Sequence, residues 1–303
     1  MDNLCHTLVG AALGETGLKR RTRFGTLTLA LASNLPDLDV LVFLTPVMPV
    51  SFRRGWTHGV AAQALLPILL TLALLAWNRW RPRREDEPPA HPGWLLVFSY
   101  VGVLLHVAMD WLNNYGVRLL MPWSGQWFYG DAVFIVDPWL YLFLGGGWWL
   151  ARRRGHGRPA VAGVLLAALY IAALVPIARA ARAEVLEAWT AREGRPPHAL
   201  MVGPWFGTPF HKQVIVDRGD GYETGHFSVL TGTLTLDERV DSLPRDHPAM
   251  RTVLANPEVQ GILVWSRFPL FELLEGPDGR SVLLTDVRFG RLRGAGTVDV
   301  PVP

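Results

Sequence analysis

The chain has 303 residues, of which 50% are hydrophobic and 18% are charged, and its formal net charge is +3. This composition is more apolar than is usual for a soluble protein of this length and indicates a membrane protein. The arginines gather in short segments between apolar runs, which argues against a nucleic-acid partner. The single cysteine, Cys5, excludes an internal disulfide and a cysteine-only zinc site.

The apolar runs before residue 180 predict a bundle of membrane helices. Residues 4–17 are apolar but too few to cross a bilayer, so we expect a short, half-buried helix there. Residues 24–44 are long enough to span, but Pro36 should end or kink the helix just before Asp37 and Asp39. Further spans are expected at residues 56–77, 94–112, 135–150 and 159–177, which makes about five in all.

The positive charges of the loops alternate in number along the chain. Successive loops carry 4, 2, 4, 1 and 4 Lys and Arg residues. By the positive-inside rule, the segments 18–24, 78–93 and 151–159 should face the cytoplasm and the segments between them the outer side. The potential ligands then fall at the outer ends of their segments: His6, Asp37, Asp39, His58, His106, Asp110, Asp131 and Asp137.

The last hundred residues read as a small soluble domain. Alternating apolar residues on both sides of Gly219–Gly221 predict a hairpin. Residues 247–260 are expected to form one helix, and residues 263–274 and 281–290 two strands joined by a turn at Gly276–Gly279. The expected fold is therefore a mainly α membrane bundle with an N-terminal half-helix, followed by a β-rich or α+β domain. Its parts are residues 1–180, a helical linker at 181–194, and residues 195–303 on the outer face.

His106 and Asp110 are four residues apart, so on a helix they share one face at adjacent turns. An imidazole and a carboxylate so placed can clamp one cation, although a buried His–Asp hydrogen bond that fixes two helices is the alternative. We expect metal ligands at His6, Asp37, His58, His106 and Asp110. This mixed nitrogen and oxygen set suits a divalent metal such as zinc, manganese or iron, with zinc preferred, and so many donors would permit two ions.

Three further side chains are candidate catalytic groups. Asp39 and Asp131 are candidates for additional ligands or a general base, and Arg54 for holding an anionic group. Each has a simpler alternative. In these alternatives, the aspartates near Pro36 cap the next turn or snorkel to the interface, Arg54 is a snorkelling interfacial residue, and Asp137 before Pro138 is a helix N-cap.

Five segments, in this order, resemble the inner-membrane-associated, metal-dependent hydrolase family (YdjM-like). They are HTLVGAALG at 6–14, NLPDLD at 34–39, RRGWTHG at 53–59, HVAMDWLNNYG at 106–116 and FYGDAVFIVDP at 128–138. The resemblance covers about the first 180 residues, and Arg53 stands where the family has a histidine. It also implies a distant similarity to zinc-dependent phospholipases C and nucleases, and hence phosphodiester or phospholipid substrates.

These residues favour hydrolysis by metal-activated water over other reactions. The expected enzyme is a multi-pass protein of a bacterial-type inner membrane that acts on an ester, such as a phosphoester, of a membrane lipid or lipid-linked substrate. A metal-transport protein and a membrane anchor without catalysis are the alternatives. The apolar stretches 61–76 and 95–103 disfavour an ion path through the bundle.

Overall fold

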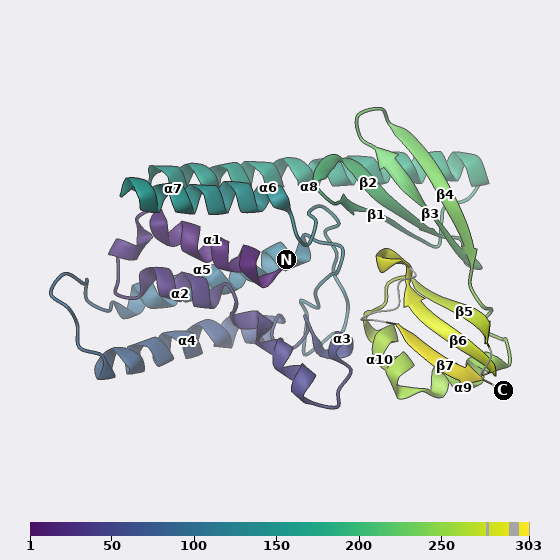
Figure 1. Cartoon of the computed structure of the whole chain (residues 1–303), viewed down its shortest axis with the longest axis horizontal. Helices are drawn as coiled ribbons and strands as arrows, with labels where there is room; N and C mark the ends of the chain where they lie inside the picture. Colours follow the sequence, from purple (N-terminus) through teal and green to yellow (C-terminus); the bar gives the residue numbers. More distant parts are fainter. Residues whose placement is uncertain (277–278, 291–296, 303) are drawn as a thin grey trace. The chain divides into compact units, whose positions relative to one another are not determined.

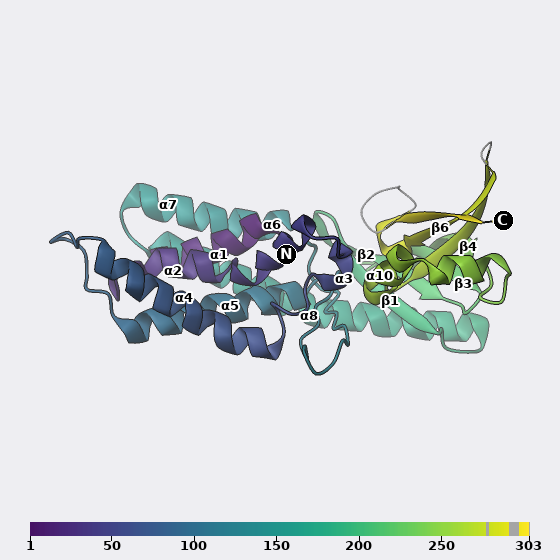
Figure 2. The same cartoon turned by 90° about the horizontal axis from the view of Figure 1, so that it is seen from below.

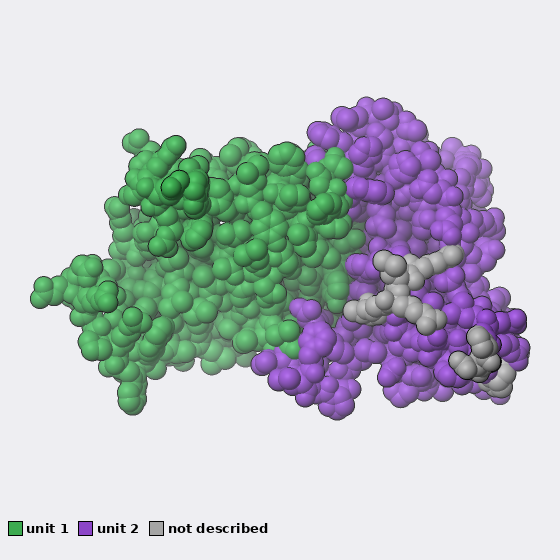
Figure 3. All heavy atoms as spheres, viewed as in Figure 1, with its two compact units in different colours: residues 1–40, 54–177, 206–208 green, residues 41–53, 178–205, 209–303 purple. Residues whose placement is uncertain are grey.

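The computed structural model of the chain describes residues 1–276, 279–290 and 297–302. It divides into two compact units, which Figure 3 colours green and purple. The first, here the helical unit, comprises residues 1–40, 54–177 and 206–208; the second, the sheet unit, comprises residues 41–53, 178–205 and 209–303.

The helical unit is built from helices of very different length (Figure 1). Its helices are α1 (Asn3–Glu15), α2 (Gly25–Ala32), α4 (Val60–Trp80), α5 (Pro92–Trp111), α6 (Pro138–Leu140), α7 (Gly146–Arg154) and the first part of α8 (Arg158–Glu193). Three further segments are helical but not α-helical. They are the 3₁₀ helices η1 (Leu18–Arg20) and η2 (Leu35–Leu44) and the π-helix η3 (Tyr141–Gly145). Helices α1, α2 and α5 pack side by side, and α4 lies against α5 (Figures 1 and 2).

Glycines let three of these helices approach closely. A side chain at Gly10 on α1 would come within 2.5 Å of the carbonyl oxygen of Leu29 on α2. A side chain at Gly102 on α5 would meet the side chain of Ala32 and lie 2.9 Å from the backbone nitrogen of Ser33. In a bilayer there is no hydrophobic driving force between helices, so their association depends on van der Waals packing. Small residues at a crossing allow the two backbones to approach closely enough for that packing. The crossings of α1 and α5 with α2 are thereby fixed.

The number of membrane spans differs from the expectation. Among the described residues, three helices are long and apolar enough to cross a bilayer: α4, α5 and α8. A fourth span arises only if α2 and η2, which meet at a bend of 50°, count as one. The break predicted at Pro36 is therefore confirmed, as is the short first helix, but five spans are not confirmed. Residues 135–150 enter a helix only at Pro138, and the apolar part up to Ala151 rises about 20 Å, less than the ~30 Å of a hydrocarbon core.

The sheet unit contains two antiparallel sheets in the described part of the chain. The first has the order β1-β2-β3-β4, from β1 (Ala199–Trp205), β2 (Thr208–Asp217), β3 (Gly221–Ser228) and β4 (Thr233–Asp241). The second has the order β5-β6-β7, from β5 (Pro269–Gly276), β6 (Gly279–Asp286) and β7 (Val298–Val302). Its short helices are α3 (Pro49–Phe52), α9 (Ala249–Ala255), α10 (Pro257–Trp265) and η4 (Val287–Phe289).

The hairpin predicted at Gly219–Gly221 is confirmed, since β2 and β3 pair from Asp217–Tyr222 onward. The single helix expected at 247–260 is wrong, because Asn256 breaks it and its side chain caps the new helix α10. Helix α10 continues to Trp265, so the next strand begins at residue 269 and not at 263. The predicted turn at Gly276–Gly279 falls on residues 277–278, outside the described residues, although these two glycines pair.

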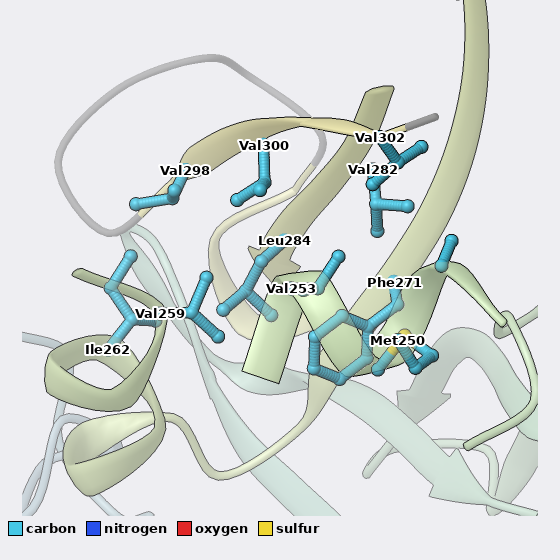
Figure 4. Close-up of a cluster of buried hydrophobic side chains, with 11 residues drawn as sticks. Met250, Val253, Val259, Ile262, Phe271, Val282, Leu284, Val298, Val300 and Val302 are labelled. Carbon is cyan, nitrogen blue, oxygen red and sulfur yellow. The ribbon is translucent and has the colours of Figure 1, made fainter. Parts of the chain in front are cut away.

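A single apolar cluster joins the helices of this unit to its second sheet (Figure 4). Val253 of α9 and Ile262 of α10 face Phe271, Leu284 and Val300 of the strands, and all five are buried. Alternate residues of a strand point to the same face, so β5, β6 and β7 each supply side chains to this one layer. Burying each such side chain stabilises the fold by roughly 1.5–3 kcal/mol.

Removing the carboxylate of Asp286 is expected to destabilise the sheet unit in a pH-dependent way. Asp286 is buried, its Oδ1 lies 2.9 Å from Nε of Arg288, and it accepts a 2.7 Å hydrogen bond from Ser266. Burial is the largest single influence and would raise the pKa of Asp286, but the charge of Arg288 and the hydrogen bonds from Arg288 and Ser266 together outweigh it, so the pKa is lowered. The stabilisation is therefore complete above the unfolded pKa, near ~3.9, and is lost as pH falls through the folded value.

Asp286→Asn should cost about 3 kcal/mol at pH 7, because it leaves the buried guanidinium of Arg288 without its anion. The cost should shrink at pH 3, below the unfolded pKa, because the unfolded carboxyl then binds a proton and the stabilisation begins to be lost. Thermal unfolding of the full chain in detergent at both pH values measures this difference. Asp246→Asn, at an exposed position, is the matched control and should change neither value. An equal loss for Asp286→Asn at both pH values would contradict the electrostatic explanation.

Candidate metal centre

Four buried side chains of the helical unit converge on one point. One ligand atom from each of Asp37, His58, His106 and Asp110 lies within 4.8 Å of the other three. Asp37 comes from η2, His58 from the turn that precedes α4, and His106 and Asp110 from the last turns of α5. The i, i+4 spacing on α5 therefore places its imidazole and carboxylate on the face that meets η2 and the start of α4.

The distances between these atoms fit a shared cation. The Nε2 atoms of His58 and His106 are 3.1 Å apart, and Oδ2 of Asp110 lies 3.3 Å from the first and 3.6 Å from the second. Oδ1 of Asp37 is 4.0 Å and 3.9 Å from the same two nitrogens. Two ligands bound to a tetrahedral zinc ion at 2.0–2.1 Å are roughly 3.3 Å apart. Only small shifts would bring these donors to that spacing.

Both imidazoles are oriented by groups behind them. Nδ1 of His106 donates a 2.7 Å hydrogen bond to the carbonyl oxygen of Ser33, so Nε2 is left with its lone pair toward the cluster. Nδ1 of His58 lies 3.5 Å from Oδ2 of Asp39 and 3.0 Å from the hydroxyl of Thr57. A carboxylate or carbonyl behind the distal nitrogen is the usual support of a metal-binding histidine.

Asp110 is the most enclosed member of the cluster. Its Oδ1 contacts Nε2 of His6 at 3.3 Å and the amino group of Met1. Its Oδ2 lies 3.0 Å from Nε of Arg54, yet it accepts no hydrogen bond from any residue that the structure describes. The charge of Arg54 partly compensates this buried oxygen, which also faces the Nε2 atoms of two imidazoles. That combination suits a cation between them.

His6 and Arg54 contact the four converging residues without being among them. The ring of His6 stacks on that of His106, with centroids 3.8 Å apart, so it touches the cluster without being one of the four converging donors. Arg54 is only 6% exposed, and its guanidinium donates to Oδ1 of Asn113 at 3.0 Å and lies over the ring of Tyr115. Its charge is thus directed to Asp110 and not to a solvent-facing rim.

The remaining predicted side chains lie in two different places. Asp39 accepts hydrogen bonds from the backbone nitrogen of Arg54 at 2.7 Å and from Thr57, and it lies behind His58. Asp131 is half-buried in the loop after α5, with φ of 51°, and is not one of the four converging residues. Asp137 caps α6 through the backbone nitrogens of residues 139 and 140, as the capping alternative predicted.

Sequence reasoning missed two supporting groups. The carbonyl of Ser33 orients His106, and no residue type signals a carbonyl acceptor because every residue has one. The amide of Asn113 binds Arg54, and its only signal in the sequence was its place directly after the Asp110 turn.

Asp39→Asn is expected to weaken metal binding by about 10- to 100-fold, because it removes the charge behind Nδ1 of His58 while keeping the shape of the side chain. Competition titration with a zinc-sensitive dye measures this change. Asp246→Asn is the matched control, since its carboxylate is exposed in the sheet unit and its loss should leave the affinity unchanged. Equal losses in both variants would show that Asp39 does not act through His58.

Comparison with known proteins gives one family and one curated relative. The model of the YdjM inner membrane protein family matches residues 1–181. The uncharacterized protein YfhP of Bacillus subtilis (strain 168) is 25% identical over 154 residues, which is 47% of this chain. The match spans 43% of that relative, less than half its length. No solved structure matches.

Proposed function

Since the chain belongs to the YdjM inner membrane protein family, we propose that it is a membrane-bound hydrolase that depends on a divalent metal. The observation that carries this function is the buried convergence of Asp37, His58, His106 and Asp110. The two imidazoles turn Nε2 toward one another, and the carboxylate oxygen between them has no hydrogen-bond donor among the described residues. Such a donor set, with two nitrogens and two oxygens, suits zinc.

Each residue then has a defined task. A divalent cation at this point supplies the Lewis acidity that activates water near neutral pH and polarises an ester. Asp37, His58, His106 and Asp110 would hold it, and Asp39 positions the imidazole of His58. A second ion would need His6 and the other oxygen of Asp110.

Arg54 is a positioning residue in this proposal. Its Nε fixes one oxygen of Asp110, while its other nitrogens bind the oxygen of Asn113 and the carbonyl of Met1. Binding of an anionic substrate group directly by Arg54, as the sequence suggested, would require the guanidinium to leave these partners.

The substrate class follows from where the donors lie along the helices. His58 precedes the first turn of α4 and Asp110 lies in the last turn of α5, so both are at one end of apolar helices of about 20 residues. An ester carried by a membrane lipid or a lipid-linked compound would be within reach there, and a phosphoester is the substrate that the sequence motifs led us to expect. The alternation of loop arginines favours the outer face for this end and for the C-terminal domain.

Metal transport is the alternative function, and a membrane anchor would not need these ligands. A transporter needs polar groups along the whole path, whereas residues 61–76 and 95–103 are almost wholly apolar. Two polar side chains of these stretches, Thr71 on α4 and Ser99 on α5, form a hydrogen bond with each other.

Chelator-sensitive hydrolysis is the expected result that separates these functions. Detergent-purified protein loaded with zinc should hydrolyse phosphodiester or carboxylester reporters, or a component of bacterial lipid extracts, and lose this activity with chelator and regain it with zinc. Asp246→Asn, at an exposed position of the sheet unit, should behave like wild type. If no such substrate is cleaved, while reconstituted vesicles take up metal ions in an Asp110-dependent way, the centre is a transport site.

A further inference from the structure

A basic pocket lies in the helical unit where α4 ends, at the opposite end of that helix from His58. It encloses about 500 Å³ and is lined by Arg23, Arg79, Arg81, Arg83 and Trp80, among others. In Figures 1 and 2 this region is the loop between α4 and α5. The metal centre uses none of these residues, so the pocket needs a separate explanation.

The pocket is held in shape by a buried arginine. Arg23 is 3% exposed, and its guanidinium donates to Oδ1 of Asn78 at 2.8 Å and to the carbonyl oxygens of Arg81 and Pro82 at 3.0 Å and 2.8 Å. Its Nε lies 2.9 Å from Oε2 of Glu87. One side chain thus ties the segment between η1 and α2 to the last turn of α4 and to the loop that follows. The remaining arginines are therefore presented from a fixed backbone.

Among the described residues, the charge on the pocket is only partly neutralised, at Arg23. The side chains of Arg79 and Arg83 are exposed and have no ion-pair or hydrogen-bond partner in the described part of the chain. The guanidinium of Arg81 lies 5.5 Å from the ring centroid of Trp77, which leaves its N–H groups available. Glu87 is already paired with Arg23, and Glu85 and Asp86 of the same loop do not line the pocket.

Tryptophans place this pocket at the level of the lipid headgroups. Trp80 is 86% exposed and Trp77 is also exposed, both in the last turns of the 21-residue apolar helix α4. Arg21 lies over Trp94, in the first turn of α5. Exposed tryptophans at the ends of membrane helices lie at the boundary between hydrocarbon and headgroups. Unpaired guanidinium groups at the same level meet lipid phosphates.

We propose that the basic pocket binds the phosphate of an anionic phospholipid headgroup. Planar guanidinium groups can each give two parallel hydrogen bonds to phosphate oxygens, and the net charge of such a lipid supplies the missing counter-charge. A second hollow of about 390 Å³ in the helical unit is lined by Lys19, Arg20 and Arg152, of which Lys19 is paired with Glu15. The site is independent of the metal centre and of hydrolysis.

The test compares lipid binding in matched arginine variants of the full chain. Arg79→Gln/Arg83→Gln removes two charges from the pocket, and Arg195→Gln/Arg251→Gln removes two exposed charges from the sheet unit. Binding of fluorescent phosphatidylglycerol and of phosphatidylcholine to detergent-purified protein is titrated at low and high salt. Wild type and the sheet-unit variant should prefer phosphatidylglycerol. The pocket variant should lose affinity for phosphatidylglycerol by roughly 10- to 30-fold, because each arginine near a membrane surface contributes about 1 kcal/mol of electrostatic attraction. Its binding should also depend less on salt, because fewer charges are left to be screened.

Circular dichroism and retained zinc binding show whether the pocket variant is folded. Equal affinities for the two lipids in wild type, or equal losses in both variants, would overturn headgroup binding. Inorganic phosphate is the second arm of the test. If millimolar phosphate displaces the lipid, or binds the detergent-purified protein as tightly as the lipid does, the pocket is a site for a soluble phosphate and not for a lipid.

Discussion

Asp110→Asn is expected to remove both the bound metal and the hydrolytic activity. Asparagine keeps the size of the side chain but not the charge that Oδ2 presents between the imidazoles of His58 and His106. The loss of metal affinity should exceed 100-fold, because a donor of the ion itself is lost, whereas loss of an outer partner typically costs about 10- to 100-fold. Metal analysis and the ester assay on the same preparation measure both effects.

One complication is the buried Arg54, which loses its anion in this variant. Removing one partner of a buried ion pair typically costs about 3–5 kcal/mol, so we expect this variant to be destabilised as well. His58→Gln is the companion variant, because it removes one metal donor and leaves the Arg54–Asp110 pair intact. Loss of metal and turnover in both variants, with His58→Gln folded, supports the centre. Wild-type activity in a folded Asp110→Asn protein would rule it out.

Gly102→Leu is expected to have the second largest effect, although Gly102 touches none of the four donors. A side chain there would collide with Ala32 and with the backbone of Ser33, whose carbonyl orients His106. Overpacking usually costs about 1–3 kcal/mol, and more where backbone must move, as here. The displaced Ser33 would release the imidazole, so metal affinity should fall together with thermal stability.

Gly146→Leu is the matched control for this change. It introduces the same side chain into helix α7 at a position where no described atom lies within 4 Å. Its melting temperature and zinc affinity should match those of the wild type. If Gly102→Leu behaves in the same way, the close crossing of α2 and α5 does not set the geometry of the centre.

The sequence was most informative where one local pattern decided the structure. The spacing of His106 and Asp110 fixes their shared face on α5, and Pro36 fixes the break before Asp37. It was least informative where tertiary contacts decide. Whether Arg54 faces a substrate or Asp110 depends on its left-handed backbone and on Asn113, which no local pattern encodes.

The same distinction explains the errors in the fold. Asn256 interrupts an otherwise helical pattern because it caps a new helix, and an isolated asparagine inside an apolar pattern gives only a weak signal of this. Residues 135–150 have an apolar composition suited to a span, but their helix begins late, at the Asp137 cap. Composition alone does not report where a helix begins.

The bend between α2 and η2 has a consequence for the setting in which the centre operates. Asp37 and Asp39 alternate along η2 with Leu38 and Val40, which are 49% and 47% exposed. Inward carboxylates and outward aliphatic side chains thus share one short segment, which belongs to a membrane span if α2 and η2 count as one. A mismatched hydrophobic length tilts or displaces such a segment. We therefore expect bilayer thickness, and with it lipid composition, to affect the geometry of Asp37.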